Sequence, residues 1–267
     1  MKNRKMIVVD LDGTALNSNH QVSITTKEYL KRLKEDGYII VIATGRILRS
    51  GINITDGAEF ADYIISSGGG SIYDNLNKKI IYQNEISKEE AETVLSIYDD
   101  DMEYIDICNY NYYYKYTVKD YKVDKTCKVS KAREGFLDNI DNITHISIIS
   151  NDGIEELYEL LQEKVPSLDY VKMQDSFSSR IWIDIFGKGA SKYNAIKIVA
   201  DIENIKNEDI ITFGDGRNDI DMIKRSGTGV AMKNALEEVK EVADYITESN
   251  DEDGIVYFLD KYLKENK

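Results

Sequence analysis

The stretch Lys5-Met6-Ile7-Val8-Val9-Asp10-Leu11-Asp12-Gly13-Thr14, near the start of the chain, decides the fold. Its apolar residues, 6 to 9, do not alternate with polar ones, which is typical of a strand buried on both faces of a parallel sheet. Gly13 marks a turn, so Asp10 and Asp12 follow the end of this strand. Ligands of open α/β sheets bind at that carboxyl edge. The sequence therefore predicts a functional site around the two aspartates.

These two aspartates need a positive charge beside them. Both side chains can reach a common point within one turn, and two close carboxylates repel unless one is protonated or a cation lies between them. A hard cation that prefers oxygen ligands, such as Mg²⁺, meets this need. Short aspartate-rich loops also occur as calcium sites or plain turns, so this stretch alone leaves those alternatives open.

Composition narrows the classes of function. The chain has 267 residues and a formal net charge of −14, which argues against nucleic acid or an anionic membrane surface as its partner. No apolar run approaches the ~20 residues that span a bilayer, and the N-terminal run is too short for a signal peptide. With only two cysteines, Cys108 and Cys127, we expect a cytoplasmic protein with reduced thiols.

Two further apolar strands end in polar residues. Residues 38–43 lead into Thr44-Gly45-Arg46, and residues 210–214 lead into Asp215-Gly216-Arg217-Asn218-Asp219. A helix expected over residues 23–37, capped by Thr25 or Thr26, separates the first two strands, which makes them a parallel pair. If the three strands are neighbours, their polar ends converge on one edge of the sheet.

A fourth strand, residues 63–66, leads into Ser67-Gly68-Gly69-Gly70. A glycine run at this place requires unusual backbone angles or the close approach of another group. Residues 71–86 predict a hairpin that leaves the main sheet, with a polar turn at 74–77.

The pattern changes at about residue 87. Ser87 and Glu90 form a capping box that begins a helix, and short tyrosine-rich strands follow at 104–108 and 112–116. We interpret these tyrosines as cover for one face of a small sheet, with an aromatic substrate surface as the alternative. The order helix, strand, strand recurs at 154–185, which indicates an internal repeat, whereas residues 119–143 are weakly patterned.

From Ser191, which can cap a helix, the sequence again alternates between predicted helices and apolar strands, as in a parallel α/β fold. The sequence thus predicts an α/β fold. Its core, residues 1–84 and 187–267, is a Rossmann-like parallel sheet with helices on both faces. An α+β cap domain, residues 85–186, is inserted into this core.

Four motifs occur in the order typical of one known family. They are Asp10-Leu11-Asp12-Gly13-Thr14, Ala43-Thr44-Gly45-Arg46, Lys188-Gly189-Ala190-Ser191-Lys192 and Gly214-Asp215-Gly216-Arg217-Asn218-Asp219. The set resembles the haloacid dehalogenase superfamily of phosphotransferases and is similar to its Cof-type sugar-phosphatase branch, whose α/β cap is inserted between the second and third motifs. The resemblance covers essentially the whole chain. It implies Mg²⁺-dependent hydrolysis of small phosphomonoesters, such as sugar phosphates or pyridoxal phosphate.

The needs of phosphoryl transfer suggest a role for each aspartate. Asp10 lies where its carboxylate could attack phosphorus and form an aspartyl-phosphate. Asp12 can protonate the leaving oxygen and later deprotonate the attacking water. By resemblance, the Asp10 carboxylate, the Asp12 main-chain carbonyl and Asp215 hold Mg²⁺.

The remaining motif residues are expected around the phosphate. Thr44 can donate a hydrogen bond to a phosphate oxygen, and Lys192 supplies the cation that an acidic chain lacks. Gly45 lets the backbone approach, and Asn218 is expected to join them in binding phosphate. Asn218 and Asp219 would also orient the lysine and the metal's waters.

Several of these residues have a second interpretation. Thr14 could only cap its own loop, and Asp219 could be a simple helix N-cap. Arg46 either touches the substrate or, as we favour, pairs with the cap. Lys188 is the alternative to Lys192 as the phosphate cation. Gly68 stands where the Cof-type branch commonly has asparagine, which puts any contact from that position in doubt.

Two other functions compete with the phosphatase. A hexose phosphomutase must hold a second phosphate in its cap, but the cap arginines, Arg133 and Arg180, are not clustered. A non-catalytic phosphosugar-binding regulator is disfavoured because Asp10 and Asp12 are both present. We expect a small phosphorylated metabolite as partner, no nucleic acid, no membrane, and a monomer or weak dimer.

Overall fold

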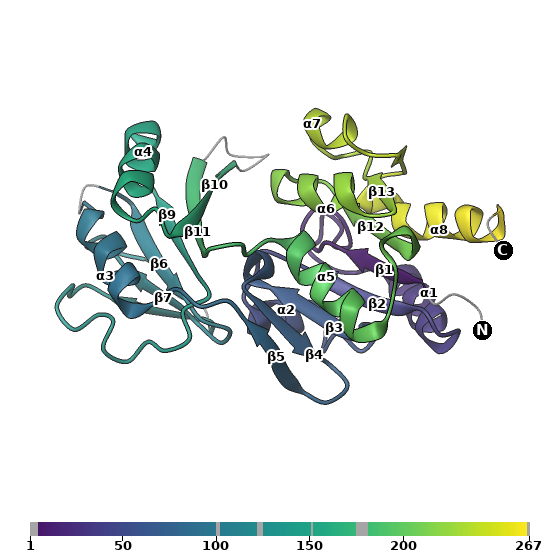
Figure 1. Cartoon of the computed structure of the whole chain (residues 1–267), viewed down its shortest axis with the longest axis horizontal. Coiled ribbons are helices and arrows are strands. Elements are labelled where there is room, and N and C mark those ends of the chain that lie inside the picture. The colour runs from purple at the N-terminus through teal and green to yellow at the C-terminus, as the bar shows by residue number, and fades with distance from the viewer. Residues whose placement is uncertain (1–4, 100–101, 122–124, 151, 175–180, 266–267) are drawn as a thin grey trace. The chain divides into compact units, whose positions relative to one another are not determined.

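The apolar run at the start of the chain forms β1 (Met6–Val9), and every one of its residues is buried. It lies between β12 (Ile210–Gly214) and β2 (Ile39–Ala43) and runs parallel to both (Figure 1). Val9 is in register with Phe213 on one side and Ile42 on the other. The three polar strand ends predicted from the sequence are therefore neighbours at one edge of the sheet.

The computed structural model describes residues 5–99, 102–121, 125–150, 152–174 and 181–265. The chain divides into two units, Met1–Tyr82 with Ser191–Lys267, and Gln83–Ala190. Among the described residues, no helix combines the length and apolar character needed to cross a membrane.

The sheet of the first unit has eight strands in the order β14-β13-β12-β1-β2-β3-β4-β5. The other members are β3 (Tyr63–Ser66), β4 (Ser71–Asp74), β5 (Lys79–Gln83), β13 (Thr228–Ala231) and β14 (Tyr245–Ile246). The predicted hairpin is present as β4 and β5, but the expectation that it leaves the main sheet is wrong. Strand β4 pairs antiparallel with β3 and so extends the sheet.

Helices cover both faces of this sheet. As a result, every residue of the central strands β1, β2 and β12 is buried, whichever face its side chain points to. Helix α1 packs against α8, and α5 packs against α6. The α/β fold class predicted from the sequence is confirmed. The helices of the unit are α1 (Ile24–Glu35), α2 (Leu48–Ile54), α5 (Lys192–Glu203), α6 (Ile220–Arg225), α7 (Glu237–Lys240) and α8 (Gly254–Glu265), with short 3₁₀ turns η1 (Ser67–Gly69), η2 (Asn207–Asp209), η3 (Arg217–Asp219) and η4 (Asn250–Glu252).

The cap of α1 differs from the prediction. Ser23, not Thr25 or Thr26, is the N-cap, and its side chain accepts a hydrogen bond from the backbone N–H of Thr26. Gly37 follows the helix with a φ of +93°, the left-handed conformation that glycine adopts most easily.

The second unit is a six-stranded sheet in the order β10-β11-β9-β6-β7-β8, with α3 (Lys88–Ile97) and α4 (Ile154–Lys164) packed on one face. The capping box of Ser87 and Glu90 is present at the start of α3. Strand β8, in the weakly patterned region, is not predicted by the sequence. Residues 175–180, which belong to the predicted repeat at 154–185, lie outside the described residues. The strands are β6 (Tyr104–Cys108), β7 (Tyr113–Tyr116), β8 (Cys127–Ser130), β9 (His145–Ile149), β10 (Leu168–Gln174) and β11 (Ile181–Gly187).

The tyrosines of this sheet lie on both faces, so our interpretation that they cover one face is wrong. Tyr116 belongs to the apolar cluster under the helices. On the other face, the buried ammonium of Lys115 lies 2.9 Å from the centroid of the Tyr104 ring and 2.8 Å from Asp106 Oδ2.

His145, in β9, makes the stability of the second unit depend on pH. The residue is 4% exposed, its Nδ1 has no hydrogen-bond partner among the described residues, and burial lowers its pKa to about 4. The unfolded chain takes up a proton near pH 6.5 and the folded chain does not, so this residue destabilises the fold as pH falls from about 6.5 to 4, by up to about 3 kcal/mol. Asp184 acts in the opposite direction, since burial raises its pKa to about 6.

The variant His145→Asn isolates the effect of His145 on the free energy of unfolding, because the effect of Asp184 is the same in the variant and in the wild type. The free energy of unfolding should fall, relative to that of the variant, by about 3 kcal/mol between pH 7 and 4. Fluorescence of Trp182, the only tryptophan, reports urea unfolding of this unit because it lies in β11. A difference between the two proteins that does not change with pH would contradict the buried, neutral His145.

Candidate functional site

A buried lysine joins two of the predicted motifs. The Nζ atom of Lys192 lies 2.6 Å from Asp10 Oδ1 and 2.6 Å from Asp219 Oδ1. All three side chains are at least nine-tenths buried. The structure therefore brings together the end of β1, the start of α5 and the loop after β12.

Glycine lets α5 begin close to the sheet. Ser191 caps the helix by accepting a hydrogen bond from the Asn194 backbone N–H, which leaves Lys192 as the first helical residue. Gly69 has a φ of +110°, and a Cβ atom there would lie 2.3 Å from the carbonyl oxygen of Ser191. The expectation that this glycine run serves unusual angles and a close approach is confirmed at Gly69, and Gly68 also has a positive φ of 63°.

Asp215 is held by the loop after β1. Thr14 Oγ1 donates a hydrogen bond to Asp215 Oδ1 at 2.8 Å, so Thr14 does more than cap its own loop. Gly13 has a φ of +77°, and a Cβ atom there would lie 2.2 Å from Asp215 Oδ2. Glycine at this position gives the Asp215 carboxylate its space.

Asp219 fixes the loop that carries Asp215. Its Oδ2 accepts hydrogen bonds from the backbone N–H groups of Asp215 and Gly216, both at 3.0 Å, while its Oδ1 faces Lys192. The side chain makes no capping hydrogen bond to α6, so the alternative of a simple N-cap is wrong.

The charges of this cluster are not balanced. Carboxylate oxygens of Asp10, Asp215 and Asp219 lie within 4.8 Å of one another, and Lys192 is the one cation bonded to them among the described residues. Burial raises the pKa of Asp10 well above its usual range, although Lys192 acts against this, and burial with the nearby Asp219 raises the pKa of Asp215 to about 7. Burial disfavours charge on Lys192, but Asp10 and Asp219 outweigh it and raise its pKa.

The residues present fit a hard divalent cation. Asp10 Oδ2 and Asp215 Oδ2 accept no hydrogen bond from any described residue, whereas both oxygens of Asp219 are engaged. Two free carboxylate oxygens beside an excess of negative charge are the donor set that Mg²⁺ prefers. The Asp10 and Asp215 carboxylates are the ligands available to it.

The expected phosphate-binding residues lie around the same strand ends. Thr44 is fully buried and its Oγ1 accepts a hydrogen bond from the Arg46 backbone N–H at 3.1 Å. Gly45 is exposed, and a Cβ atom there would lie 3.6 Å from the side-chain amide nitrogen of Asn218. The loops after β2 and β12 therefore approach each other beside Thr44.

Arg46 has a partner that the sequence analysis does not anticipate. Its Nε and Nη2 donate to the two carboxylate oxygens of Asp12, at 2.7 and 2.6 Å, and its Nη1 donates to Ser50. The Asp12 side chain is half exposed, so this pair lies at the open side of the site. Asp12 and Arg46 each stand two positions after a residue that directly follows a strand, Asp10 and Thr44, but this spacing alone does not show that their side chains meet.

Lys188 makes its described contact within the second unit, where its Nζ lies 2.7 Å from Asp169 Oδ1 and its side chain is largely exposed. Lys192 is the lysine bonded to the aspartate cluster. Of the two candidates for the phosphate cation, the geometry favours Lys192.

Comparison with known proteins gives a consistent result. A model of the haloacid dehalogenase-like hydrolase family matches residues 7–259. A Bacillus subtilis protein named 5-amino-6-(5-phospho-D-ribitylamino)uracil phosphatase YwtE is 28% identical, with 97% of this chain and 98% of that protein covered. A putative phosphatase of Buchnera aphidicola from Acyrthosiphon pisum is 30% identical, with 98% and 97% covered.

Solved structures agree with this. A haloacid dehalogenase-like hydrolase from B. subtilis is similar with a TM-score of 0.82 and 25% identity, covering 96% of this chain and 99% of that one. One from Bacteroides thetaiotaomicron has a TM-score of 0.78 and 26% identity, covering 97% and 100%. The Cof-type resemblance is confirmed, and the chain belongs to the family of haloacid dehalogenase-like hydrolases.

Proposed function

We propose that this protein is a Mg²⁺-dependent phosphatase that hydrolyses small phosphomonoesters through a phosphorylated Asp10. The observation that carries the proposal is the asymmetry of the Asp10 carboxylate, with one oxygen bonded to Lys192 and the other accepting no hydrogen bond from any described residue. A carboxylate fixed in this way is a positioned nucleophile. The relatives named as phosphatases support the same activity.

The chemistry divides between two aspartates. An Asp10 oxygen attacks phosphorus while the bond to the ester oxygen breaks, and Asp12 gives that oxygen a proton. Asp12, now a base, then takes a proton from water as the water oxygen attacks phosphorus. Inorganic phosphate leaves and the Asp10 carboxylate is restored.

Positive charge and hydrogen-bond donors hold the phosphate. Lys192 is already in place beside Asp10, and Thr44, Gly45 and Asn218 supply donors at the adjoining strand ends. The Asp10 and Asp215 carboxylates and the Asp12 main-chain carbonyl would hold Mg²⁺. When bound, Mg²⁺ supplies charge that lowers the repulsion between the phosphate and the Asp10 carboxylate.

The phosphomutase alternative needs a second phosphate site in the cap. Among the described cap residues, Arg133 Nη2 donates to the Tyr98 carbonyl oxygen and Lys115 is buried against Asp106. Arg180 lies outside the described residues. The phosphatase hypothesis therefore has more support than the phosphomutase hypothesis. The presence of both Asp10 and Asp12 disfavours a non-catalytic regulator.

We further propose a small phosphorylated metabolite as substrate. We also propose a cytoplasmic location, which is supported by two cysteines, Cys108 and Cys127, that form no disulfide. Three B. subtilis relatives are named 5-amino-6-(5-phospho-D-ribitylamino)uracil phosphatases. That compound therefore belongs in a substrate panel, beside sugar phosphates and pyridoxal phosphate.

Substitution of Asp10 tests whether its carboxylate is the nucleophile. Asp10→Asn should lower phosphate release across the panel by about 10³-fold or more, because an amide cannot serve as the nucleophile. A chelator should abolish release by the wild type, and added Mg²⁺ should restore it. Asp201→Asn, an exposed aspartate on α5, serves as the matched control and should keep full activity.

Three other results would each contradict the proposed phosphatase activity through Asp10. Full activity of Asp10→Asn would mean another nucleophile. Isomerisation of a hexose phosphate without phosphate release would identify a mutase. Tight binding of phosphate esters by the wild type, with no turnover in the presence of Mg²⁺, would identify a regulator.

Substitution of Arg46 tests whether this residue positions Asp12. If it holds Asp12 for proton transfer, Arg46→Met should harm substrates whose leaving group needs a proton. We expect kcat/KM to fall about 10²-fold for a sugar phosphate and only a few-fold for p-nitrophenyl phosphate, whose phenolate leaves unprotonated. Arg32→Met, on the exposed surface of α1, is the control. Equal losses for both substrates would show that Arg46 binds the phosphate instead.

A further inference from the structure

The loop after β13, residues 232–236, is bonded to both loops that carry the expected metal ligands. The side-chain amide of Asn234 donates a hydrogen bond to the carbonyl oxygen of Gly13 at 2.7 Å. Two residues further on, the backbone N–H of Leu236 donates to the carbonyl oxygen of Asp215 at 3.1 Å. Because β12 lies between β13 and β1, Asn234 reaches past the end of β12 to the loop after β1. One short loop therefore links the ends of both strands.

A second asparagine fixes the orientation of the Asn234 amide. The Oδ1 atom of Asn234 accepts a hydrogen bond from the backbone N–H of Asn250 at 3.1 Å, so the amide nitrogen is the atom that faces Gly13. The side chain of Asn250 donates in turn to the carbonyl oxygen of Leu16 at 2.8 Å. The two asparagines thus hold the loop after β1 at two of its carbonyl groups.

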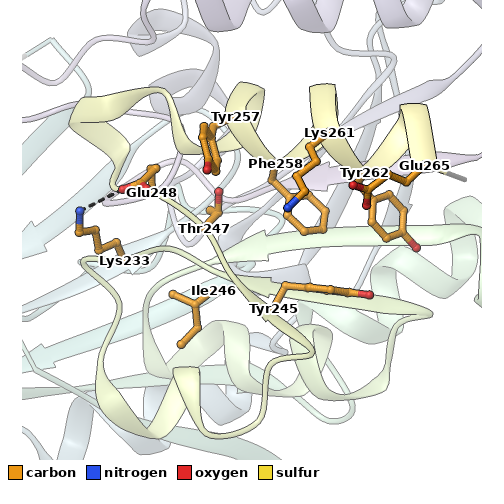
Figure 2. A pocket seen from close by; sticks show the side chains of 10 residues that line it. All are labelled: Lys233, Tyr245, Ile246, Thr247, Glu248, Tyr257, Phe258, Lys261, Tyr262 and Glu265. Carbon is orange, nitrogen blue, oxygen red and sulfur yellow. Dashed lines mark hydrogen bonds and ion pairs between the residues drawn. The ribbon is translucent and has the colours of Figure 1, made fainter.

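The residue before Asn234 is anchored as well. Figure 2 shows Lys233 pointing to Glu248, and the Nζ atom lies 2.9 Å from Glu248 Oε2 and 3.4 Å from Glu252 Oε2. The backbone N–H of Lys233 also donates to the carbonyl oxygen of Glu248, at 3.4 Å. These contacts tie the loop after β13 to the same segment that carries Asn250, so Asn234 is held from two directions.

The carbonyl that Asn234 holds belongs to the peptide group between Gly13 and Thr14. The N–H of this group donates to the Leu11 carbonyl oxygen at 3.2 Å, so with Asn234 the group is held at both ends. The hydroxyl of Thr14 donates to Asp215 Oδ1 and leaves Oδ2 available to a cation. Glycine tolerates a wide range of backbone angles, and Gly13 has a φ of +77°. A bond from outside the loop therefore helps to fix the direction in which Thr14 points the Asp215 carboxylate.

We propose that Asn234 is a positioning residue for the divalent cation. Its hydrogen bond to the Gly13 carbonyl holds Thr14, and through Thr14 the Asp215 carboxylate, in the arrangement that binds Mg²⁺. The inference rests on the proposed function for the identity of the cation. Hydrogen-bond partners that orient metal ligands without touching the metal typically change metal affinity 10- to 100-fold.

Calorimetric titration of Mg²⁺ into the full chain, without substrate, tests this role. Asn234→Ala should raise the dissociation constant for Mg²⁺ about tenfold. Asn234→Leu should raise it equally, because leucine keeps the volume of the side chain but cannot donate to Gly13. In assays of phosphate release, excess Mg²⁺ should restore kcat of Asn234→Ala to within about twofold of the wild type, and KM for the phosphate ester should not change.

Asn207→Ala is the matched control. Asn207 is also exposed, and its side chain donates to the Arg225 carbonyl oxygen at 2.9 Å and accepts a hydrogen bond from the Tyr193 hydroxyl at 3.2 Å. It precedes β12, so it lies at the edge of the sheet opposite the site. The variant loses hydrogen bonds of the same kind and should bind Mg²⁺ like the wild type. Urea unfolding without Mg²⁺ should show a similar small loss of stability in both alanine variants, which shows that Asn234→Ala is folded.

The results that would overturn this role differ from those that would overturn the proposed function. If the wild type needs Mg²⁺ but Asn234→Ala and Asn234→Leu bind it equally well, Asn234 does not position the site. Equal weakening by Asn207→Ala would show a general effect of lost stability and would also overturn the role of Asn234. A wild type that binds no Mg²⁺ and releases no phosphate would overturn both the role of Asn234 and the phosphatase.

Discussion

The ammonium of Lys192, buried between Asp10 and Asp219, is the interaction on which the site depends. A buried ammonium costs several kcal/mol unless carboxylates surround it closely. The start of α5 must therefore reach the ends of β1 and β12, and small residues make that approach possible. Gly69 admits the backbone of Ser191, and Gly214 admits Asp219, whose Cβ would lie 2.5 Å from a Cβ at that position.

The same arrangement explains why the site can do chemistry. One lysine cannot neutralise three clustered carboxylates, and burial together with this excess of negative charge raises the pKa values of Asp10 and Asp215. Both carboxylate oxygens of Asp219 are hydrogen-bonded, one to Lys192 and the other to the loop backbone. Asp219 therefore positions Lys192 and the loop and has no oxygen left for a ligand. Asp10 and Asp215 each keep one oxygen available. Structure, charge and proposed function therefore rest on the same few atoms.

The sequence predicts the parts of this site that depend on local pattern. Unbroken apolar runs identify β1, β2 and β12, and the polar residues after each run are those that meet in space. It does not predict the Arg46–Asp12 pair, which depends on how two loops face each other. The same holds for the hairpin that extends the sheet and for β8, whose sequence alternates weakly and which is formed by pairing with β7. The cap of α1 is also not predicted, because serine and threonine are both good N-cap residues. Only the position where the backbone becomes helical shows that Ser23 is the N-cap and that Thr25 lies within the helix.

The most direct test of the account is to find which side chain carries the phosphoryl group during turnover. Borohydride reduces an acyl phosphate to an alcohol, so quenching the turning-over enzyme with it should convert the phosphorylated aspartate to homoserine. Peptide mapping by mass spectrometry then locates the change. If Asp10 is the nucleophile, homoserine should appear at position 10 alone, and only when both substrate and Mg²⁺ are present. Homoserine at another aspartate, or none while phosphate is being released, would contradict it.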